Sequence, residues 1–385
     1  MTDRLVLVLG MHRSGTSALT RVLNLRGAAL PDALLPANQA NVVGYWEPAA
    51  VVTWHDEFLA AAGSAWDDPT ELPVEAFATP AAERFVGQVS ELLRRDLAAA
   101  PLVVMKDPRA CRLVPLWRQA AARAGRETSM VLIVRHPIEV AASLQRRDGM
   151  PISQAWLLWL EHVLAAEAST REDRRSIVTY DRLLGDWRGT IASVERDLGL
   201  ELPAAGADVE ARIDDFLSAD LRHERVESAS IDEGQMPQGV RRVYRWHERA
   251  SAAAGACDPA ELDDIRAELR RAAILYAPVI RAQREAAARQ SAELHEQGER
   301  DRQQWASERD AAARREHELH AAIVTLQADA SALGETLAAL EARLAAQERT
   351  SATRQAYLES VLSTRTWRLR TWCLRQASKI TGRSY

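Results

Sequence analysis

The chain has 385 residues, enough for one domain of about 250 residues and an extension. Hydrophobic residues make up 47% of the chain and charged residues 27%, which is ordinary for a soluble protein. The formal net charge of -5 gives no global electrostatic reason to expect a nucleic-acid partner, so any anion site must come from a local concentration of charge.

The cysteines and the apolar runs indicate the compartment. Cys111, Cys257 and Cys373 lie far apart and form no C-x-x-C pair, which argues against a disulfide framework and a cysteine-based zinc site. The first apolar run, residues 5–9, is far too short for a signal-peptide core or a membrane span. We therefore expect a cytoplasmic protein.

The chain opens with a strand, a glycine loop and a helix. Residues 4–23, RLVLVLGMHRSGTSALTRVL, nearly match the nucleotide-binding pattern G-x-x-x-x-G-K-[ST]. Gly10, Gly15 and Ser17 fit, but Thr16 occupies the position of the lysine. The pattern therefore predicts a phosphate-like ligand without the lysine that ATP hydrolysis requires.

The loop can supply its own donors and charge. Backbone N–H groups at a helix N-terminus converge on an anion, and Thr16 and Ser17 add hydroxyl donors. Arg13 supplies the positive charge a few residues earlier, and its planar fork can bridge two anion oxygens.

Later apolar runs alternate with helical patterns, which predicts an α/β fold with a mainly parallel sheet buried on both faces. The further strands are expected in residues 101–108, 129–137 and 176–181. The helices are expected in residues 16–26, 81–99, 111–124, 137–147 and 153–169. Ligands of such sheets bind at the carboxyl ends of the strands, so the residues that end each strand are the candidates for a site.

Three strand ends carry polar residues of this kind. Arg135 ends the third apolar run, Pro137 suits the first helical position, and Ser143 follows Arg135 by eight residues in VRHPIEVAASLQRR. Lys106 ends the second run in MKDPR, and Tyr180 follows the fourth run in TYD. Tyr180 could equally be a packing residue at the sheet end.

Flanking charges in the same segments have simpler interpretations. Arg109 either assists the site or binds Asp107. Arg146 and Arg147 could add charge to the site but are more easily understood as solvated charges.

The loop HRSGTSAL resembles the 5'-phosphosulfate-binding loop of the sulfotransferase superfamily, and the Arg135/Ser143 pair resembles the family's 3'-phosphate site. The bacterial carbohydrate and tyrosylprotein types are the most similar, over roughly residues 4–225. The resemblance implies a nucleotide-kinase-like three-layer fold and 3'-phosphoadenosine 5'-phosphosulfate (PAPS) as co-substrate. It implies donor-binding roles for a set of residues: Arg13, Ser14, Gly15, Thr16, Ser17, Arg135, Ser143 and Tyr180.

The resemblance also suggests catalytic groups. Lys106 and Arg13 would stabilise the charge on the transferring group, and no metal is implied. At the end of the matching region, His223 in FLSADLRHER is a further candidate to approach the donor.

A general base must take the acceptor's proton, and three residues compete for this role. Glu47 in GYWEP resembles the glutamate that bacterial carbohydrate sulfotransferases place after the donor loop, and a desolvated glutamate beside Trp46 would have a raised pKa. His55 is the second candidate and Asp56 the third.

The favoured function is transfer of a sulfuryl group from PAPS to a hydroxyl, with a glycan or glycosylated metabolite as the preferred acceptor. Two other functions stay open. One is a kinase that uses ATP and Mg²⁺, against which Thr16 and the Arg135/Ser143 pair argue. The other is a catalytically silent scaffold of a surface-polysaccharide assembly.

The C-terminal part differs in composition from the rest, and we predict three segments: a sulfotransferase domain in 1–278, a helical segment in 279–350 and a basic tail in 351–385. Pro278 is the last proline. An a/d heptad seam follows, formed by Leu319, Ile323, Leu326, Ala330, Leu333, Leu337, Leu340 and Leu344. Its spacing predicts a coiled coil that pairs with a second copy or a partner protein. The alternative is one long amphipathic helix that packs back on the domain.

The tail, VLSTRTWRLRTWCLRQASKITGRSY, is basic and carries Trp367 and Trp372 without any acidic residue. It suits either an anionic membrane surface, which would place the protein peripherally at the inner membrane face, or an acidic protein surface.

Overall fold

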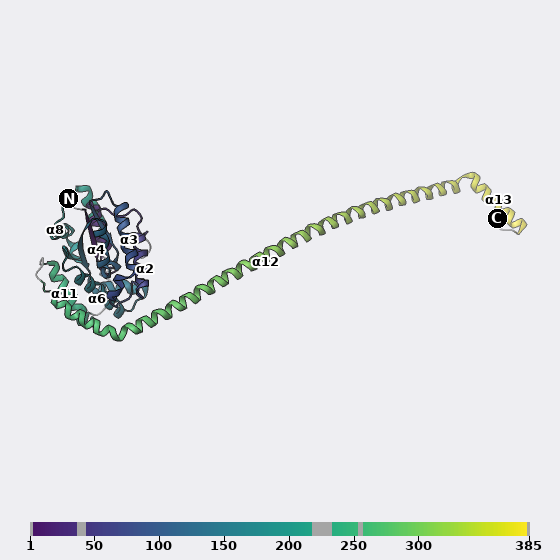
Figure 1. Cartoon of the computed structure of the whole chain (residues 1–385). Helices are drawn as coiled ribbons and strands as arrows, with labels where there is room; N and C mark the ends of the chain where they lie inside the picture. The colour runs from purple at the N-terminus through teal and green to yellow at the C-terminus, as the bar shows by residue number, and fades with distance from the viewer. Residues whose placement is uncertain (1–2, 37–43, 218–232, 253–256, 383–385) are drawn as a thin grey trace. The chain divides into compact units, whose positions relative to one another are not determined.

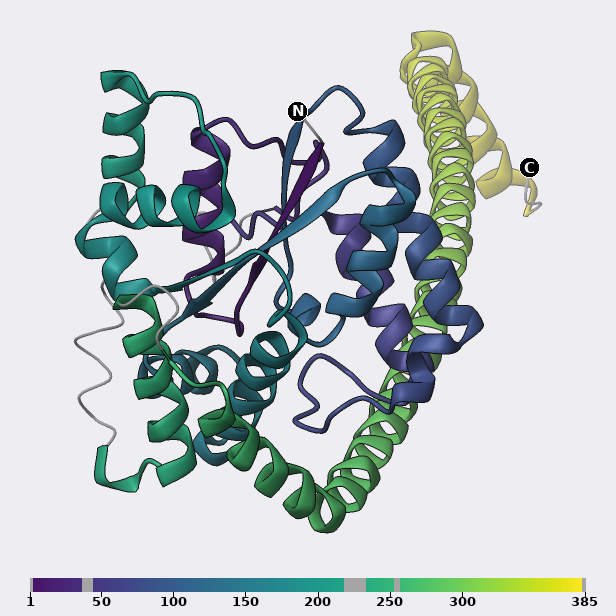
Figure 2. The same ribbon diagram turned by 60° about the vertical axis from the view of Figure 1, so that its left-hand side comes forward.

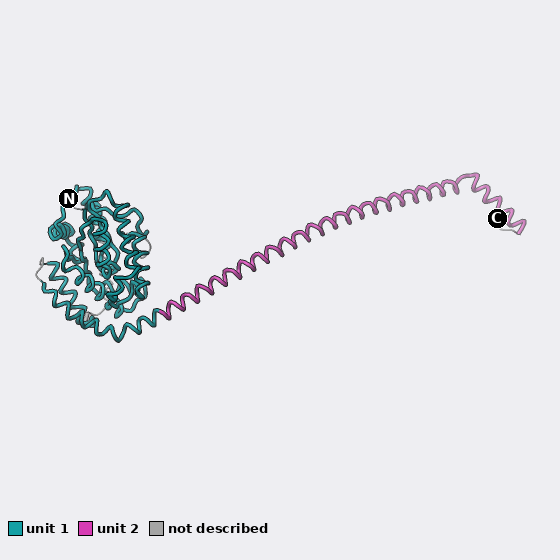
Figure 3. Tube along the Cα trace, in the orientation of Figure 1, with its two compact units in different colours: residues 1–284 teal, residues 285–385 magenta. Residues whose placement is uncertain are grey.

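The computed structural model describes residues 3–36, 44–217, 233–252 and 257–382. Two compact units make up the chain, Met1–Arg284 and Glu285–Tyr385 (Figure 3). The first unit holds the sheet, and the second is helical (Figure 1).

The sheet has four parallel strands in the order β2-β1-β3-β4. Their bounds are β1 Arg4–Leu9, β2 Leu102–Lys106, β3 Glu127–Val134 and β4 Arg175–Thr179. All four expected strands are present, and the α/β class with a parallel sheet is confirmed. Because the strands are parallel and in register, Gly10, Lys106, Arg135 and Tyr180 lie at the same edge of the sheet.

Helices cover both faces of this sheet. In the first half of the chain they are α1 Thr16–Leu25, α2 Ala49–Ala61, α3 Pro80–Arg95, α4 Val114–Arg123, α5 Pro137–Asp148 and α6 Ile152–Ser169. Further along the first unit they are α7 Tyr180–Gly185, α8 Trp187–Leu198, α9 Ala207–Phe216 and α11 Gln238–Ala252. Helix α12, Ala260–Ser363, begins in the first unit and continues into the second, and α13, Arg365–Thr381, belongs to the second unit. Short 3-10 turns lie at η1 Val74–Ala78, η2 Pro108–Arg112 and η5 Glu233–Gln235.

Alternation along β1 creates the three layers. Leu5, Leu7 and Leu9 pack against α2, α3 and α4, whereas Val6 and Val8 pack against α1 and α8 on the opposite face. Figures 1 and 2 show the helices on either side of the sheet.

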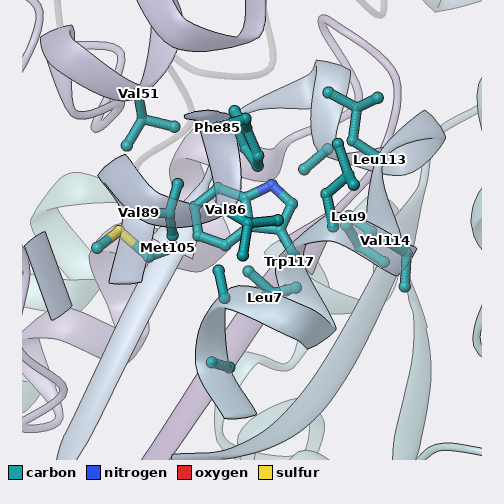
Figure 4. Close-up of a cluster of buried hydrophobic side chains, with 14 of the residues drawn as sticks. Leu7, Leu9, Val51, Phe85, Val86, Val89, Met105, Leu113, Val114 and Trp117 are labelled. Atoms are coloured by element: carbon teal, nitrogen blue, oxygen red, sulfur yellow. The ribbon is translucent and has the colours of Figure 1, made fainter. Parts of the chain in front are cut away.

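The core beneath α3 and α4 is dense. Figure 4 shows Trp117 among side chains from β1 and α3, including Leu7, Leu9 and Val86. Residues of α5, α6 and α11 form a further cluster that also contains Leu262 and Ile265, at the start of α12. Because these apolar residues pack there, α12 begins at Ala260, well before the expected boundary at residue 278.

The compact unit therefore extends beyond Pro278, which lies inside α12. Arg284 pairs with Asp67 and, at 2.8 Å, with Asp68, which explains why the unit ends after that residue. The expected tail begins as a separate helix only at Arg365.

The heptad seam lies within α12, and its apolar side chains are exposed in the single chain, from 51% for Ile323 to 73% for Leu333. Its pairing as a coiled coil stays a prediction. Nowhere in the described residues is a helix both long and apolar enough to cross a bilayer.

A buried carboxyl group in α6 makes folding sensitive to pH. Glu161 is buried 3.9 Å from Arg112, and its burial raises its pKa from 4.5 to about 7 despite that arginine. The folded state thus binds this proton more tightly than the unfolded chain. The contribution of Glu161 to the free energy of unfolding therefore falls as the pH rises from about 4.5 to about 7.

We expect Glu161→Gln to remove this dependence. Between about pH 5 and pH 8, the stability of the variant relative to the wild type should rise by up to about 3 kcal/mol. Urea unfolding at the two pH values measures the change, with the exposed Glu172→Gln as control. An equal difference at both pH values would contradict the prediction.

Candidate active site

The loop between β1 and α1 has an unusual backbone. Gly15 caps α1 with φ 86° and no side-chain cap, so the first N–H groups of the helix point toward the loop without a capping oxygen. Arg13 also has a positive φ of 68°. Such a backbone is costly for a residue with a side chain and concentrates at functional sites.

The second described non-glycine residue with a positive φ is Trp46, at 57°. It immediately precedes Glu47, and the guanidinium of Arg21 lies 4.3 Å from its ring centroid. Arg13 and Trp46, the two described non-glycine residues with a positive φ, therefore border the same region.

That region is a cavity of about 120 Å³ at the carboxyl ends of the strands. Its lining residues come mainly from the loop between β1 and α1, from the segment before α2 and from the ends of the other three strands. They are His12, Arg13, Gly15, Thr16, Ser17, Ala18, Tyr45, Glu47, Lys106, Pro108, Arg135, Arg147, Tyr180 and Phe216.

Lys106 connects the loop to the Glu47 segment. Its Nζ donates to the Ser17 Oγ at 3.1 Å and to the Tyr45 carbonyl oxygen at 2.9 Å, and it forms an ion pair with Glu47. Only 4% of Lys106 and 4% of Glu47 is exposed. Burial, the largest influence, raises the pKa of Glu47 above its ordinary value even though Lys106 opposes the shift.

A second set of contacts joins the loop to the end of β3. Arg13 Nε donates to the Ser143 Oγ at 2.7 Å, and Arg135 Nη1 donates to the Arg13 carbonyl oxygen at 3.2 Å. Arg135 also pairs with Glu139 at 2.7 Å, and its guanidinium lies 4.8 Å from the ring centroid of Tyr180. Two arginines thus meet at one end of the cavity.

Tyr180 closes this end against the loop. A Cβ on Gly15 would overlap the Tyr180 ring, and a Cβ on Gly10 would approach the Ile133 carbonyl oxygen and the Thr16 methyl group. Both glycines are therefore required for close approach, and Gly15 is also required for its backbone conformation.

Several predicted site residues do not line the cavity. Ser143 accepts a hydrogen bond from Arg13, which does line it. Ser14 is fully buried, and its side chain does not line the cavity. His55 is also fully buried: its Nδ1 lies 2.9 Å from Asp107 Oδ2, and its Nε2 accepts from Trp117 Nε1 at 3.0 Å. With both ring nitrogens bound in the interior, His55 is not placed to meet a substrate in the cavity.

Asp107, the partner of His55, is a buried carboxylate that its neighbours keep ionised. Burial alone would raise the pKa of Asp107, but His55 and Arg109 hold it well below its ordinary range. Arg109 also donates to Asp56 at 2.6 Å. Arg109 also binds Asp107, with 3.1 Å between Nη1 and Oδ1, as its simpler interpretation predicted. Neither Arg109 nor Asp56 lines the cavity.

Sequence reasoning missed several residues of the cavity. Arg147 lines it and its guanidinium lies 5.4 Å from the Trp66 ring centroid, so this residue adds positive charge at the cavity. His12 lies edge-on to Trp66 at 4.8 Å, and its Nε2 has no hydrogen-bond partner among the described residues. Burial, together with Arg109 and Arg147, holds the pKa of His12 well below 6.5. Its position within the loop was the only available signal.

Residues 6–204 match the profile of the sulfotransferase family, which spans slightly more than half of the chain. The chain belongs to the sulfotransferase family. Its membership supports sulfotransferase activity, and the cavity lies inside the matched region except for Phe216. No curated protein sequence matches the chain significantly.

Solved structures that resemble this sulfotransferase include three bacterial examples. The sulfotransferase domain of the Synechococcus PCC 7002 olefin synthase is 19% identical, with 61% of this chain and 96% of that chain covered and a TM-score of 0.36. The sulfotransferase domain of the curacin biosynthetic pathway is 14% identical, with 69% and 97% covered and a TM-score of 0.36. Sulfotransferase STF1 from Mycobacterium tuberculosis H37Rv is 16% identical, with 60% and 78% covered and a TM-score of 0.30.

Two further observations complete the site of this sulfotransferase. Within the described ranges, no group of three or more His, Cys, Asp or Glu side chains is arranged to hold a metal ion. His223, a candidate from the sequence, lies outside the described residues.

Gly15→Ala tests the packing of the loop. We expect a loss of about 1–3 kcal/mol in the free energy of unfolding, because alanine is strained at this φ and its methyl group overlaps Tyr180. Adding Tyr180→Ala should make the Gly15→Ala change less costly, leaving the backbone part of about 1 kcal/mol.

Urea unfolding of the four members of this cycle measures the coupling. Gly87→Ala is the matched control, because Gly87 lies inside α3 with open space around it and should gain up to about 1 kcal/mol. Additive effects of Gly15→Ala and Tyr180→Ala would contradict the described packing.

Proposed function

We propose that this sulfotransferase transfers the sulfuryl group of PAPS to a hydroxyl acceptor, with a glycan or glycosylated metabolite as the acceptor class. The observation that carries the proposal is the meeting of two sets in one cavity. Arg13 and Arg135 form an anion-binding end, with Ser143 accepting a hydrogen bond from Arg13, and the buried pair of Lys106 and Glu47 forms a reactive end.

The residues present fit the donor. The loop amides, Thr16 and Ser17 are suited to the 5'-phosphosulfate, Arg135 and Ser143 to the 3'-phosphate, and Tyr180 to the adenosine. Gly15 allows the loop to approach the Tyr180 ring, and Gly10 allows it to approach the Ile133 carbonyl oxygen, which holds the loop at the end of the sheet. When bound, PAPS supplies an electrophilic sulfur on a good leaving group.

The protein's own groups account for the rest of the chemistry. Glu47 takes the proton of the acceptor hydroxyl, and the acceptor oxygen forms a bond to sulfur in line as the bond from sulfur to the bridging oxygen breaks. Lys106 and Arg13 stabilise the negative charge on the sulfuryl and bridging oxygens. The product is a sulfate ester, and the leaving group is 3',5'-adenosine bisphosphate.

Glu47 is favoured as the base over the two other candidates. It lines the cavity, it is buried, and its raised pKa brings its basicity closer to neutral pH. His55 has both nitrogens occupied, and Asp56 is paired with Arg109.

Ligand binding separates this function from its rivals. We expect 3',5'-adenosine bisphosphate to raise the melting temperature of the full chain by several degrees, since a ligand at 100 times its Kd stabilises by about 2.7 kcal/mol. ATP with Mg²⁺ should give little or no shift, and labelled sulfate should pass from PAPS to glycan or glycoside acceptors.

A shift with ATP and Mg²⁺ alone would overturn the proposal in favour of a kinase. Binding of the bisphosphate without transfer to hydroxyl acceptors of any class would favour the silent scaffold. Transfer to a phenol but to no sugar would retain the sulfotransferase and overturn the glycan acceptor.

Glu47→Gln tests the base. We expect turnover to fall by about 10²–10⁴-fold, while 3',5'-adenosine bisphosphate still binds, because the amide cannot accept the proton. In the wild type, kcat/KM should fall on the acid side below a pKa higher than the usual 4.3 of glutamate, because Glu47 must be ionised to act.

The matched control is Glu57→Gln, an exposed change on the next helix, α2. It should leave both turnover and the pH profile unchanged. Retained turnover in Glu47→Gln, with an unaltered acid limb, would remove Glu47 from the mechanism.

A further inference from the structure

The last helix of the chain is a separate amphipathic element. α13 runs from Arg365 to Thr381; the side chain of Thr364 accepts from the Trp367 N–H at its start, and Gly382 ends it at φ 68°. Both ends carry their own caps, which define this helix apart from α12.

Its charges have a single sign. The charged residues of α13 are Arg365, Arg368, Arg370, Arg375 and Lys379. At 3.6 residues per turn, four of them fall within an arc of about 80°. These four are Arg365, Arg368, Arg375 and Lys379. Arg370 lies outside this arc, where its long stem allows the guanidinium to reach a polar boundary.

A stretch of the helix surface next to this cationic arc is apolar and uncovered. Leu369, Cys373 and Ile380 share an arc of about 40°, whose centre lies about 100° around the helix from the centre of the cationic arc. Leu369 is 65% exposed and Ile380 is 84% exposed, and no described residue of α13 is buried. Trp372, 59% exposed, lies within the cationic arc between Lys379 and Arg365, a position that suits an indole at a boundary between water and lipid.

We propose that α13 lies flat on an anionic lipid surface, with Leu369 and Ile380 among the acyl chains and the arginines at the headgroups. A bilayer interface offers negative charge and apolar depth on the same surface, which matches both arcs of the helix at once. The proposal is independent of the catalytic function and assigns the protein to the cytoplasmic leaflet, whose lipids carry the negative charge.

Sedimentation of the full chain with vesicles tests the proposal. We expect binding to vesicles of phosphatidylcholine with about 30% phosphatidylglycerol, and on the order of tenfold weaker binding or less to phosphatidylcholine alone. High salt should weaken binding because it screens the cationic arc.

Two variants measure the contributions of the cationic arc and of the apolar arc to vesicle binding separately. Replacing Arg368, Arg375 and Lys379 by Glu should reduce binding to the anionic vesicles by on the order of a hundredfold. Leu369→Gln with Ile380→Gln keeps the charge and should also weaken binding, because the apolar arc is lost.

The matched control replaces Arg300, Arg302 and Arg309 by Glu, the same change of charge at exposed positions of α12 outside the heptad seam. It should bind as the wild type does. Circular dichroism and the melting temperature of each variant show whether the fold is retained.

Several results would overturn the proposal. They are absence of binding to either vesicle, equal binding to neutral and anionic vesicles, and equal loss in the α12 control. Capture of α13 by an acidic protein with no recruitment to vesicles would assign the helix to a protein partner instead.

Discussion

The buried ion pair between Lys106 and Glu47 holds the site together. Both groups are nearly inaccessible to water, and each would be costly to bury alone, so neither can be removed without leaving an uncompensated charge. The pair links the end of β2 to the segment before α2, and through Ser17 it reaches the first turn of α1. The ion pair with Lys106 neutralises the charge of the Glu47 carboxylate and also holds this carboxylate beside the anion-binding loop.

Backbone strain occurs on either side of this pair. Arg13 and Trp46 both adopt positive φ values, and both border the cavity or the glutamate that faces it. Packing maintains these conformations, since Arg13 is tied to Ser143 and Arg135, and Trp46 contacts Arg21. Strain of this kind is retained where the surrounding structure over-determines it, which is consistent with a preorganised site.

The interior beneath the site uses a different set of charges. Asp107 binds His55 and Arg109, and it also fixes the turn that follows β2 by accepting from the Arg109 N–H at 2.9 Å. The side chains of this cluster do not line the cavity. Charged residues that are neighbours in sequence thus have different roles: Lys106 lines the cavity, whereas Asp107 and Arg109 belong to the interior cluster.

The sequence by itself determined the strands, their parallel arrangement and the residues at their carboxyl ends, because buried apolar runs and glycine loops are local signals. Gly15, Arg13, Lys106, Arg135 and Tyr180 were all anticipated in this way. Tertiary structure alone decided that His55 and Ser14 point into the interior, that Arg147 and His12 reach the cavity, and that α12 begins before Pro278. Those outcomes depend on which side chains meet across elements far apart in sequence, and neither periodicity nor motif spacing encodes such contacts.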